Sequence, residues 1–335
     1  MISVGLIGYG YWGPNMARNI QENNDMKLRI ICDSNTYSLQ RASQRYPHVR
    51  CTDNVKEILN DPKIDAVIIA TPANTHFDLA SQALNSGKHV LVEKPMTDSV
   101  QSALELLELS EKVNRVLMVD HTFIYTPAVN QLKKIVSSGE LGSILYYDSI
   151  RINLGLFQHD INVIWDLAPH DISIMHYLIE KSPVSVSAQG AKFFDSEIES
   201  IAYVHLTFDD GLIAHFHVNW LAPVKIRRTV IGGSKKMTVY DDVEPTEKIK
   251  VYDKGIDVTS EEGILETLVQ YRTGDIQIPH LENREALSVE IDHFKDCIIN
   301  GKVPITDSHA GLEVVKVLEA AHQSIRKEGL PVFFD

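Results

Sequence analysis

Cysteine is scarce in this chain of 335 residues. Its three cysteines, Cys32, Cys51 and Cys297, lie far apart, are odd in number and form no Cys-x-x-Cys pair. Such spacing favours neither a disulfide framework nor a zinc site, and it is typical of a protein from a reducing compartment.

Long apolar runs are also missing. No stretch approaches the roughly 18 apolar residues that a membrane-spanning helix needs. The N-terminal residues, Met1-Ile2-Ser3-Val4-Gly5, run directly into an apolar strand and lack the charged and apolar regions of a signal peptide. We therefore expect a cytoplasmic protein with no membrane partner.

The third deficit is in positive charge. The formal net charge of -13 argues against a general nucleic-acid or membrane-surface role. With 44% hydrophobic and 23% charged residues, the composition is globular, and the length suffices for two domains. An anionic ligand would then need a local group of basic residues, and the densest comprises Lys225, Arg227, Arg228, Lys235 and Lys236.

The N-terminal segment carries a glycine motif between a strand and a helix. Residues 2–7 form an apolar strand, Gly8-Tyr9-Gly10-Tyr11-Trp12-Gly13 follows, and a helix is expected from Pro14. Glycines at these places allow a tight turn, close approach to a pyrophosphate and close helix packing, with the helix N-terminus facing the phosphates. The alternative is a structural glycine turn in another α/β protein. The motif predicts cofactor contacts from Gly8, Gly10, Tyr11, Trp12 and Gly13.

A carboxylate follows the second predicted strand. This strand, Lys27–Cys32, ends in Asp33, twenty residues after Gly13. A carboxylate there accepts hydrogen bonds from adenosine ribose hydroxyls and repels a 2′-phosphate, which favours NAD over NADP. Arg41 and Arg45 are the residues that would favour NADP instead.

Further strands alternate with helices up to about residue 121. Ile64–Ala70 leads into a loop, and we expect its residues Thr71, Pro72, Asn74 and His76 to border the cofactor's ribose and nicotinamide. His76 has an equal alternative as the cap of the helix Phe77–Leu84. The alternation, which ends with the strand Val116–Val119, predicts a doubly wound parallel sheet in an NAD-binding Rossmann domain over residues 1–121.

Glu93-Lys94-Pro95 ends the strand that begins at His89. Pro95 bars Lys94 from the α region and holds it extended at the strand tip. Ligands of open parallel sheets bind beyond these tips, so we expect Glu93 and Lys94 to contact the bound cofactor or substrate. A surface lysine before a turn is the ordinary alternative. We also predict a cis peptide bond between Lys94 and Pro95.

The pattern changes after residue 122, which indicates a second, α+β domain over residues 122–335. Strands follow one another without helices between them, as in a large, mainly antiparallel open sheet. Asp209-Asp210-Gly211 predicts a hairpin turn, and two helices close the chain. The expected strands are Ile144–Ile152, Val184–Lys192, Ile201–Phe208, Leu212–Trp220, Arg227–Ile231 and Met237–Tyr240, and the final helices Arg284–Ile299 and His309–Arg326.

The strands of this domain alternate between two kinds of side chain. Apolar residues such as Val204 and Phe216 point one way, and His205, His215 and His217 the other. The second face is either exposed to solvent or paired with another subunit. We favour a homodimer or homotetramer formed through this sheet.

A second chemical segment lies between Asn153 and Asp171. Asp166 and His170 are four residues apart, so a helix would place them on one face. A histidine beside a carboxylate can act as a general base. Alternatively, Asp166 caps the helix and His170 packs beneath it. Pro169 suits a first helical turn, which suggests that the helix begins near it.

No metal site is expected. His159 with Asp160 and His170 with Asp171 lack a third histidine or cysteine at ligand spacing.

Together, the GYGYWG loop, Asp33, the TPxxxH loop, Glu93-Lys94-Pro95 and the Asp166-x-x-x-His170 spacing resemble the Gfo/Idh/MocA oxidoreductase family from end to end. The segments LGLFQHDINVIWDLAPHDIS and VDHTFIYTPAV look closest to its nucleotide-sugar 3-dehydrogenases, which act on UDP-N-acetylglucosamine or its uronate. Ala168-Pro169 departs from many relatives, in which glycine or small aliphatic residues precede the histidine.

The resemblance implies an NAD-dependent enzyme that removes hydride from C3 of a UDP-N-acetylhexosamine or its uronate. Lys94 would contact the nicotinamide ribose and the reacting hydroxyl, His170 would take the proton, and Asp166 would orient the pair. Reduction of a dTDP-ketosugar, oxidation of a free cyclitol, and a non-catalytic NAD-binding redox regulator are the alternatives. The expected sugar and diphosphate ligands, which read equally well as ordinary surface residues, are Arg151, Asn153, Gln158, Asn162, Lys225 and Arg227.

Overall fold

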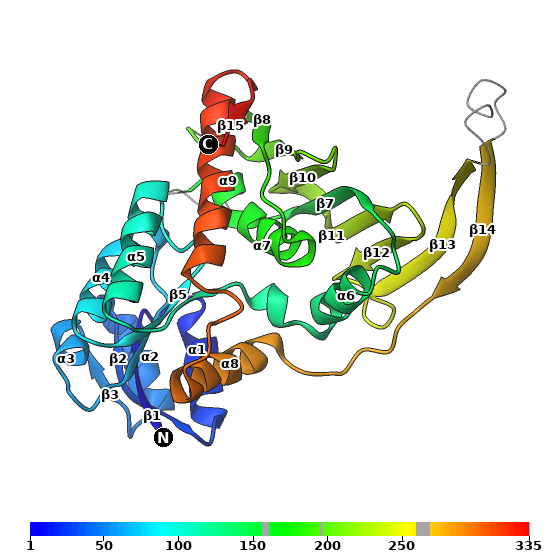
Figure 1. Ribbon diagram of the computed structural model, residues 1–335. Coiled ribbons are helices and arrows are strands. Elements are labelled where there is room, and N and C mark those ends of the chain that lie inside the picture. The colour runs from blue at the N-terminus through cyan, green and yellow to red at the C-terminus, as the bar shows by residue number, and fades with distance from the viewer. Residues whose placement is uncertain (156–160, 195–196, 259–268, 335) are drawn as a thin grey trace. The chain divides into compact units, whose positions relative to one another are not determined.

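The computed structural model describes residues 1–155, 161–194, 197–258 and 269–334 (Figure 1). The chain divides into two compact units: Met1–Thr126 with Arg284–Lys316, and Pro127–Asn283 with Val317–Asp335. The sequence pattern instead predicts that all residues from 122 to 335 belong to the second domain. The difference arises because α8 (Ala286–Asn300) packs on α1 (Gly13–Glu22) and on η2 (Thr122–Tyr125) of the first unit.

The first unit contains the predicted parallel sheet. Its strand order is β3-β2-β1-β4-β5-β6. Successive strands are added on one side of β1 up to β3 and on its other side from β4 onward, and ligands of such sheets bind in the crevice at this switch point. Every residue of β1 and β4 is buried, as a sheet covered on both faces requires. The strands are β1 (Ile2–Ile7), β2 (Met26–Cys32), β3 (Arg50–Thr52), β4 (Ala66–Ile69), β5 (His89–Glu93) and β6 (Leu117–Asp120).

The helices of this unit begin at recognisable caps. The Asn35 side chain accepts hydrogen bonds from the amides of Tyr37 and Ser38 and starts α2, and the Ser99 hydroxyl starts α5 in the same way. The remaining elements of the unit are α2 (Thr36–Arg45), α3 (Lys56–Leu59), η1 (Ala73–Thr75), α4 (His76–Asn85), α5 (Val100–Lys112) and the first half of α9 (Ser308–Arg326).

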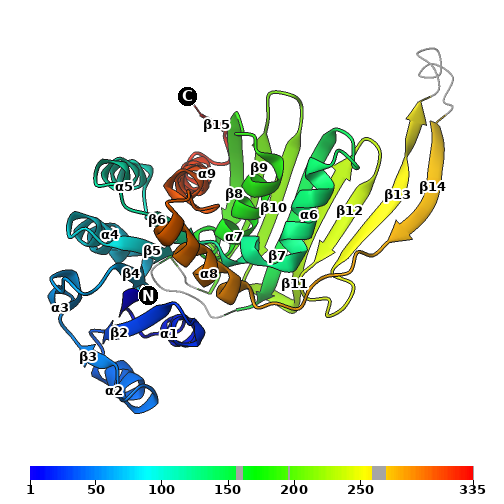
Figure 2. The same cartoon turned by 60° about the horizontal axis from the view of Figure 1, so that its bottom comes forward.

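The second unit contains a nine-stranded sheet of order β14-β13-β12-β11-β7-β10-β9-β8-β15 (Figure 2). Of the pairs between described strands, β7 with β10 is parallel and the others are antiparallel. The predicted α+β class and the hairpin at Asp209-Asp210-Gly211 are thus confirmed. The strands are β7 (Ile144–Leu154), β8 (Ser185–Ala191), β9 (Ile201–Thr207), β10 (Ile213–Asn219), β11 (Leu221–Gly233), β12 (Met237–Asp241), β13 (Ile249–Val258), β14 (Val269–Gln277) and β15 (Val332–Phe333).

One face of this sheet carries helices α6 (Pro127–Ser137) and α7 (Val163–Ile179), as Figures 1 and 2 show. Helix α7 packs on β7, β9 and β10. Beneath it lie buried side chains that the alternation predicted, including Val204, Leu206, Phe216 and Trp220. No described helix of this unit covers the opposite face. None of the described helices is long and apolar enough to cross a membrane.

The predicted start of the helix at Asp166 and His170 is wrong. Helix α7 begins at Val163, six residues before Pro169, because the Asn162 side chain accepts a hydrogen bond from the Trp165 amide and caps it. Pro169 therefore lies inside the helix, where it offers no N–H to the carbonyl of Trp165.

Candidate active site

The glycine loop of the first unit has the shape that its sequence predicts. Gly8 has a φ of 95°, and a Cβ there would lie 2.3 Å from the carbonyl oxygen of Ala70. A Cβ at Gly13 would lie 2.3 Å from the carbonyl oxygen of Gly8. Gly10, in contrast, is exposed with open space around it. Two glycines thus let the loop pack, and the third leaves its backbone open to a ligand.

Asp33 is fixed beside this loop. Its Oδ2 accepts a hydrogen bond from the Tyr9 amide at 2.6 Å, and its Oδ1 accepts one from the Asn35 amide at 2.7 Å. Tyr11 and Trp12 are exposed and meet edge to face, with ring centroids 5.7 Å apart. An open glycine backbone, the N-terminus of α1 and an oriented carboxylate fit the phosphates and ribose of a dinucleotide.

His76 joins the two loops that follow β4 and β5. Its Nε2 lies 2.8 Å from the carbonyl oxygen of Thr71, and its Nδ1 lies 2.8 Å from that of Pro95. The N-cap of α4 is Thr75, so the capping alternative for His76 is wrong. Burial lowers the pKa of His76, although the two carbonyl oxygens favour a proton on each ring nitrogen. These two contacts indicate that His76 supports both the loop after β4 and the loop after β5.

The other predicted residues of the first loop differ in exposure. The Thr71 hydroxyl lies 2.7 Å from that of Thr75, which holds η1. Pro72 and Asn74 are exposed and stay candidates for cofactor contact.

Lys94 lies at the end of β5, and its peptide bond to Pro95 is cis, as predicted. The Lys94 amide donates a hydrogen bond to Oε2 of Glu93 at 3.2 Å, and the Lys94 residue is half-buried. Glu93 is only 7% exposed. This burial favours a supporting role for Glu93 over the predicted contact with the cofactor.

Helix α7 of the second unit presents Asp166 in its first turn and His170 one turn later, on the same face. Oδ2 of Asp166 accepts a hydrogen bond from the indole Nε1 of Trp220 at 3.0 Å. Because Asn162 is the cap, the alternative that Asp166 caps this helix is wrong. Both residues are half-buried. Asp166 and His170 therefore share one helix face, and both stay candidates for the predicted general base and its orienting carboxylate.

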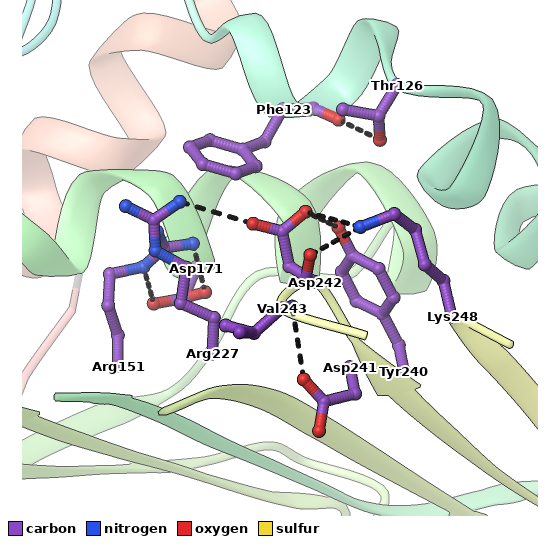
Figure 3. Close-up of polar contacts among 10 residues, drawn as sticks. All are labelled: Phe123, Thr126, Arg151, Asp171, Arg227, Tyr240, Asp241, Asp242, Val243 and Lys248. Atoms are coloured by element: carbon purple, nitrogen blue, oxygen red, sulfur yellow. Dashed lines mark hydrogen bonds and ion pairs between the residues drawn. The ribbon is translucent and has the colours of Figure 1, made fainter. Parts of the chain in front are cut away.

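Two predicted substrate ligands instead hold the second unit together. Arg151 is 3% exposed, and its Nε and Nη2 donate to Asp171 at 2.7 and 3.0 Å (Figure 3). Buried Asn162 caps α7 and donates from Nδ2 to Glu199 at 2.8 Å. We therefore remove Arg151 and Asn162 from the candidate substrate ligands, because their polar groups are buried and bonded to protein.

The remaining substrate candidates are placed differently. Lys225 is exposed in β11, and Asn153 is half-buried near the end of β7. Nη1 of Arg227 lies 3.2 Å from Oδ2 of Asp242 (Figure 3). Gln158 lies outside the described residues.

Asp242 was not anticipated as a site residue. It accepts a hydrogen bond from the Tyr240 hydroxyl at 3.1 Å, and Nζ of Lys248 lies 3.7 Å from its Oδ1 (Figure 3). Two cations thus converge on one carboxylate beside β11 and β12. The available signal was the acidic pair Asp241-Asp242 at the end of β12, which follows the basic group around Arg227 in the sequence.

No group of three or more metal-ligating side chains that could hold an ion occurs among residues 1–155, 161–194, 197–258 and 269–334.

Comparison with known proteins gives two family matches. Residues 2–121 match the model described as oxidoreductase family, NAD-binding Rossmann fold. Residues 129–239 match the Gfo/Idh/MocA C-terminal domain. Together they cover more than half of the chain.

Similar proteins extend over the full length. The chain is 27% identical to scyllo-inositol 2-dehydrogenase (NAD+) of Bacillus subtilis, with 100% of this chain and 95% of the relative covered. It is also 27% identical to UDP-N-acetylglucosamine 3-dehydrogenase of Acidithiobacillus ferrooxidans, with 93% of each covered. A solved structure of a protein of that name from the same organism, GnnA, has a TM-score of 0.81 at 25% identity and covers 97% of this chain and 98% of its own.

Proposed function

Because the chain belongs to the Gfo/Idh/MocA family of oxidoreductases, we propose that it oxidises a sugar hydroxyl with NAD, most specifically the C3 hydroxyl of a UDP-N-acetylhexosamine or its uronate. The Asp166 and His170 pair on one face of α7 carries this proposal, because a proton acceptor is what hydroxyl oxidation requires.

NAD is the cofactor of this NAD-dependent dehydrogenase, and the residues around the glycine loop suit it. The α1 N-terminus and the open backbone at Gly10 would take the pyrophosphate. Asp33 would accept the adenosine ribose hydroxyls and disfavour a 2′-phosphate. Arg41 and Arg45, the residues that would favour NADP, lie over the rings of Tyr37 and Tyr46, at 6.0 and 5.8 Å from the centroids.

The protein's own residues supply position and proton transfer. NAD, when bound, accepts the hydride that leaves the substrate carbon. His170 takes the hydroxyl proton as the general base, and Asp166, held by Trp220, stabilises the resulting imidazolium. Lys94, on a loop supported by His76 and Glu93, stabilises the negative charge that develops on the substrate oxygen.

The nucleotide-sugar assignment rests on the relative from Acidithiobacillus ferrooxidans and on the basic residues of β11. A diphosphate needs cationic partners. Exposed Lys225 of β11 offers one, and Arg227 and Lys248 would offer two more by exchanging the Asp242 carboxylate for phosphate. Asn153 and Gln158 complete the proposed sugar ligands.

A free cyclitol is the second candidate substrate, because the inositol dehydrogenase of Bacillus subtilis is equally similar over the whole chain. Reduction of a dTDP-ketosugar by the same residues in reverse is a third. A non-catalytic NAD-binding regulator would need the glycine loop but neither Lys94 nor the Asp166 and His170 pair.

A substrate scan separates these possibilities. Purified protein with NAD is offered UDP-N-acetylglucosamine, its uronate, scyllo-inositol and myo-inositol, and NADH formation is followed at 340 nm; a dTDP-ketosugar with NADH tests the reverse direction. We expect turnover with the UDP-sugars. Turnover with inositols alone would reassign the substrate, and NAD binding without turnover on any compound would favour the regulator.

The uncovered face of the nine-stranded sheet is the proposed surface for assembly into a homodimer or homotetramer. It carries aromatic and imidazole rings in stacks: Tyr203 on His217 at 4.4 Å and His205 on His215 at 4.6 Å. Ile213 on this face is 57% exposed. Apolar side chains in such a setting favour a protein partner over solvent.

Light scattering after gel filtration tests this surface. Ile213→Glu should shift the protein to a smaller species, whereas Leu104→Glu on the exposed side of α5 should not. A wild-type monomer would contradict the proposal.

A further inference from the structure

Three carboxyl groups meet in the interior of the first unit, each from a different element. Glu93 ends β5 and Asp120 ends β6, and the two residues pair across the strands. Glu290 comes from α8, almost 200 residues later. Their exposures are 7%, 3% and 0%. We call these three residues the carboxyl cluster.

The setting of the cluster favours protonated carboxyl groups. Oε1 of Glu93 and both carboxyl oxygens of Glu290 are buried and receive no hydrogen bond from the described residues. A carboxylate without donors is costly to bury, whereas a carboxylic acid can donate to the neighbouring Asp120. Asp120, in contrast, accepts hydrogen bonds at its Oδ1 from the Thr122 amide and hydroxyl. We therefore expect Glu93 and Glu290 to be the protonated members. Burial, and then the neighbouring Asp120, raise the pKa of each well above its ordinary value.

Other groups around Glu290 do not neutralise it. Thr122 contributes a hydroxyl, and the buried ring of Tyr125 lies near, with its own pKa raised by burial and by Glu290. Lys94 is the cation that acts on Glu93. A buried carboxylate at Glu290 would thus face Asp120 and Glu93 without a cation of its own among the groups that set its pKa.

The cluster ends at the backbone of Lys94. Oε2 of Glu93 accepts the hydrogen bond from the Lys94 amide, and His76 holds the next residue, Pro95, from the other side. Movement of Glu93 would therefore displace the loop that presents Lys94.

We propose that Glu290 is a positioning residue: by sharing its proton with Asp120, it keeps Glu93 and hence the Lys94 loop in place. The inference rests on the proposed function only for its effect on turnover; its effects on stability and NAD binding are independent of the substrate. Removal of the proton would put repelling charges at the ends of β5 and β6.

The direction of the pH effect follows. A carboxyl group whose pKa is raised by folding stabilises the folded state at low pH, and this contribution is lost as the pH rises from the ordinary value toward the raised one. Glutamine at position 290 keeps a donor for Asp120 and cannot ionise. Glu290→Gln should therefore reduce the alkaline loss, because only Glu93 can still ionise, and it should keep the geometry.

The test uses full-length wild type, Glu290→Gln, Glu290→Ala and, as a matched control, Glu108→Gln at an exposed position of α5. Tm and the Kd for NAD are measured from pH 5 to 9.5, and kcat and KM over the same range. We expect wild type and Glu108→Gln to lose Tm and kcat at alkaline pH, and Glu290→Gln to lose less of both. Glu290→Ala should lower kcat about tenfold or more with a smaller change in KM, and the glutamine variant should restore it.

The outcomes are distinct. An identical pH dependence of Tm in wild type and Glu290→Gln would overturn the proposal, whether or not Glu290→Ala folds. Glu290→Gln could instead flatten the pH profile of Tm and leave the pH dependence of kcat and of NAD binding as in wild type. Glu290 would then have only a structural role, and the proposal would also be overturned. If no sugar is turned over, the profiles of Tm and NAD affinity still decide it, so failure of the proposed function is recognised separately.

Discussion

The two sheets of this protein are built in different ways and expose different groups. In the six-stranded parallel sheet, β1 and β4 are buried throughout, and the candidate functional groups lie at the strand tips. In the nine-stranded sheet one face is packed beneath α7 and the other carries stacked rings. The comparison suggests a division of labour: the first sheet presents backbone and loops to a cofactor, and the second presents side chains.

The two units also differ in how they bury ionisable side chains. The first unit buries the carboxyl cluster, in which burial raises the pKa of Glu93 and Glu290, whereas the second buries the Arg151 and Asp171 ion pair, whose groups are bonded to each other. We therefore expect the first interior to be sensitive to alkaline pH and the second to loss of either partner.

The largest expected effect comes from one residue of each unit. Lys94→Ala and His170→Ala should each lower kcat/KM by about 10²–10⁴-fold, because both groups act on the charge or proton of the transition state. Steady-state kinetics measure this, with circular dichroism to verify folding. Near-normal turnover in either folded variant would remove that residue from the mechanism.

The buried ion pair should give the largest effect on stability. Arg151→Met leaves the Asp171 carboxylate uncompensated, and we expect a loss of about 3–5 kcal/mol in the free energy of unfolding. Arg151→Met combined with Asp171→Leu should recover much of this loss. Urea unfolding of wild type and the two variants provides the values, and an Arg151→Met variant as stable as wild type would show that the pair is dispensable.

The two asparagine caps allow a direct comparison of the units. Asn35→Ala at the exposed cap of α2 should cost about 1 kcal/mol. Asn162→Ala should cost about 2–3 kcal/mol, because it also leaves buried Glu199 without its amide donor. Equal losses in urea unfolding would mean that the Glu199 contact adds nothing.

Asp33 should have the smallest effect and a selective one. Asp33→Ala removes the acceptor for the ribose hydroxyls and the repulsion of a 2′-phosphate, so the ratio of kcat/KM for NAD over NADP should fall about tenfold. Kinetics with both cofactors test this. An unchanged ratio would show that residues other than Asp33 determine the preference between NAD and NADP.

Local patterns predicted the first unit well because its determinants are local. Buried parallel strands read as continuous apolar runs, and the glycine loop, Asp33 and Glu93-Lys94-Pro95 each have a short signature. The sequence pattern does not assign α8 to this unit, because α8 is an amphipathic helix far along the chain from the other elements of the parallel sheet. Nothing within that helix distinguishes Glu290 from a solvent-exposed glutamate, so the carboxyl cluster is visible only in three dimensions.

The second unit was predicted less completely because its determinants are tertiary. Strand β13 includes Lys250, Asp253 and Lys254, which obscure its alternation. Arg151 resembles a surface ligand until Asp171 is seen beside it, and the start of α7 depended on whether Asn162 or Pro169 dominated locally. Burial of a polar residue depends on its partner, which single-chain patterns do not reveal.

Transfer of isotope from substrate to cofactor tests the central claim most directly. UDP-N-acetylglucosamine with deuterium at C3, or its uronate, is incubated with the enzyme and NAD, and the reduced cofactor is analysed by mass spectrometry. We predict NADH that carries the deuterium, formed far more slowly by the His170→Ala variant. Unlabelled NADH, or reduction of NAD by inositols but by neither UDP-sugar, would contradict the account.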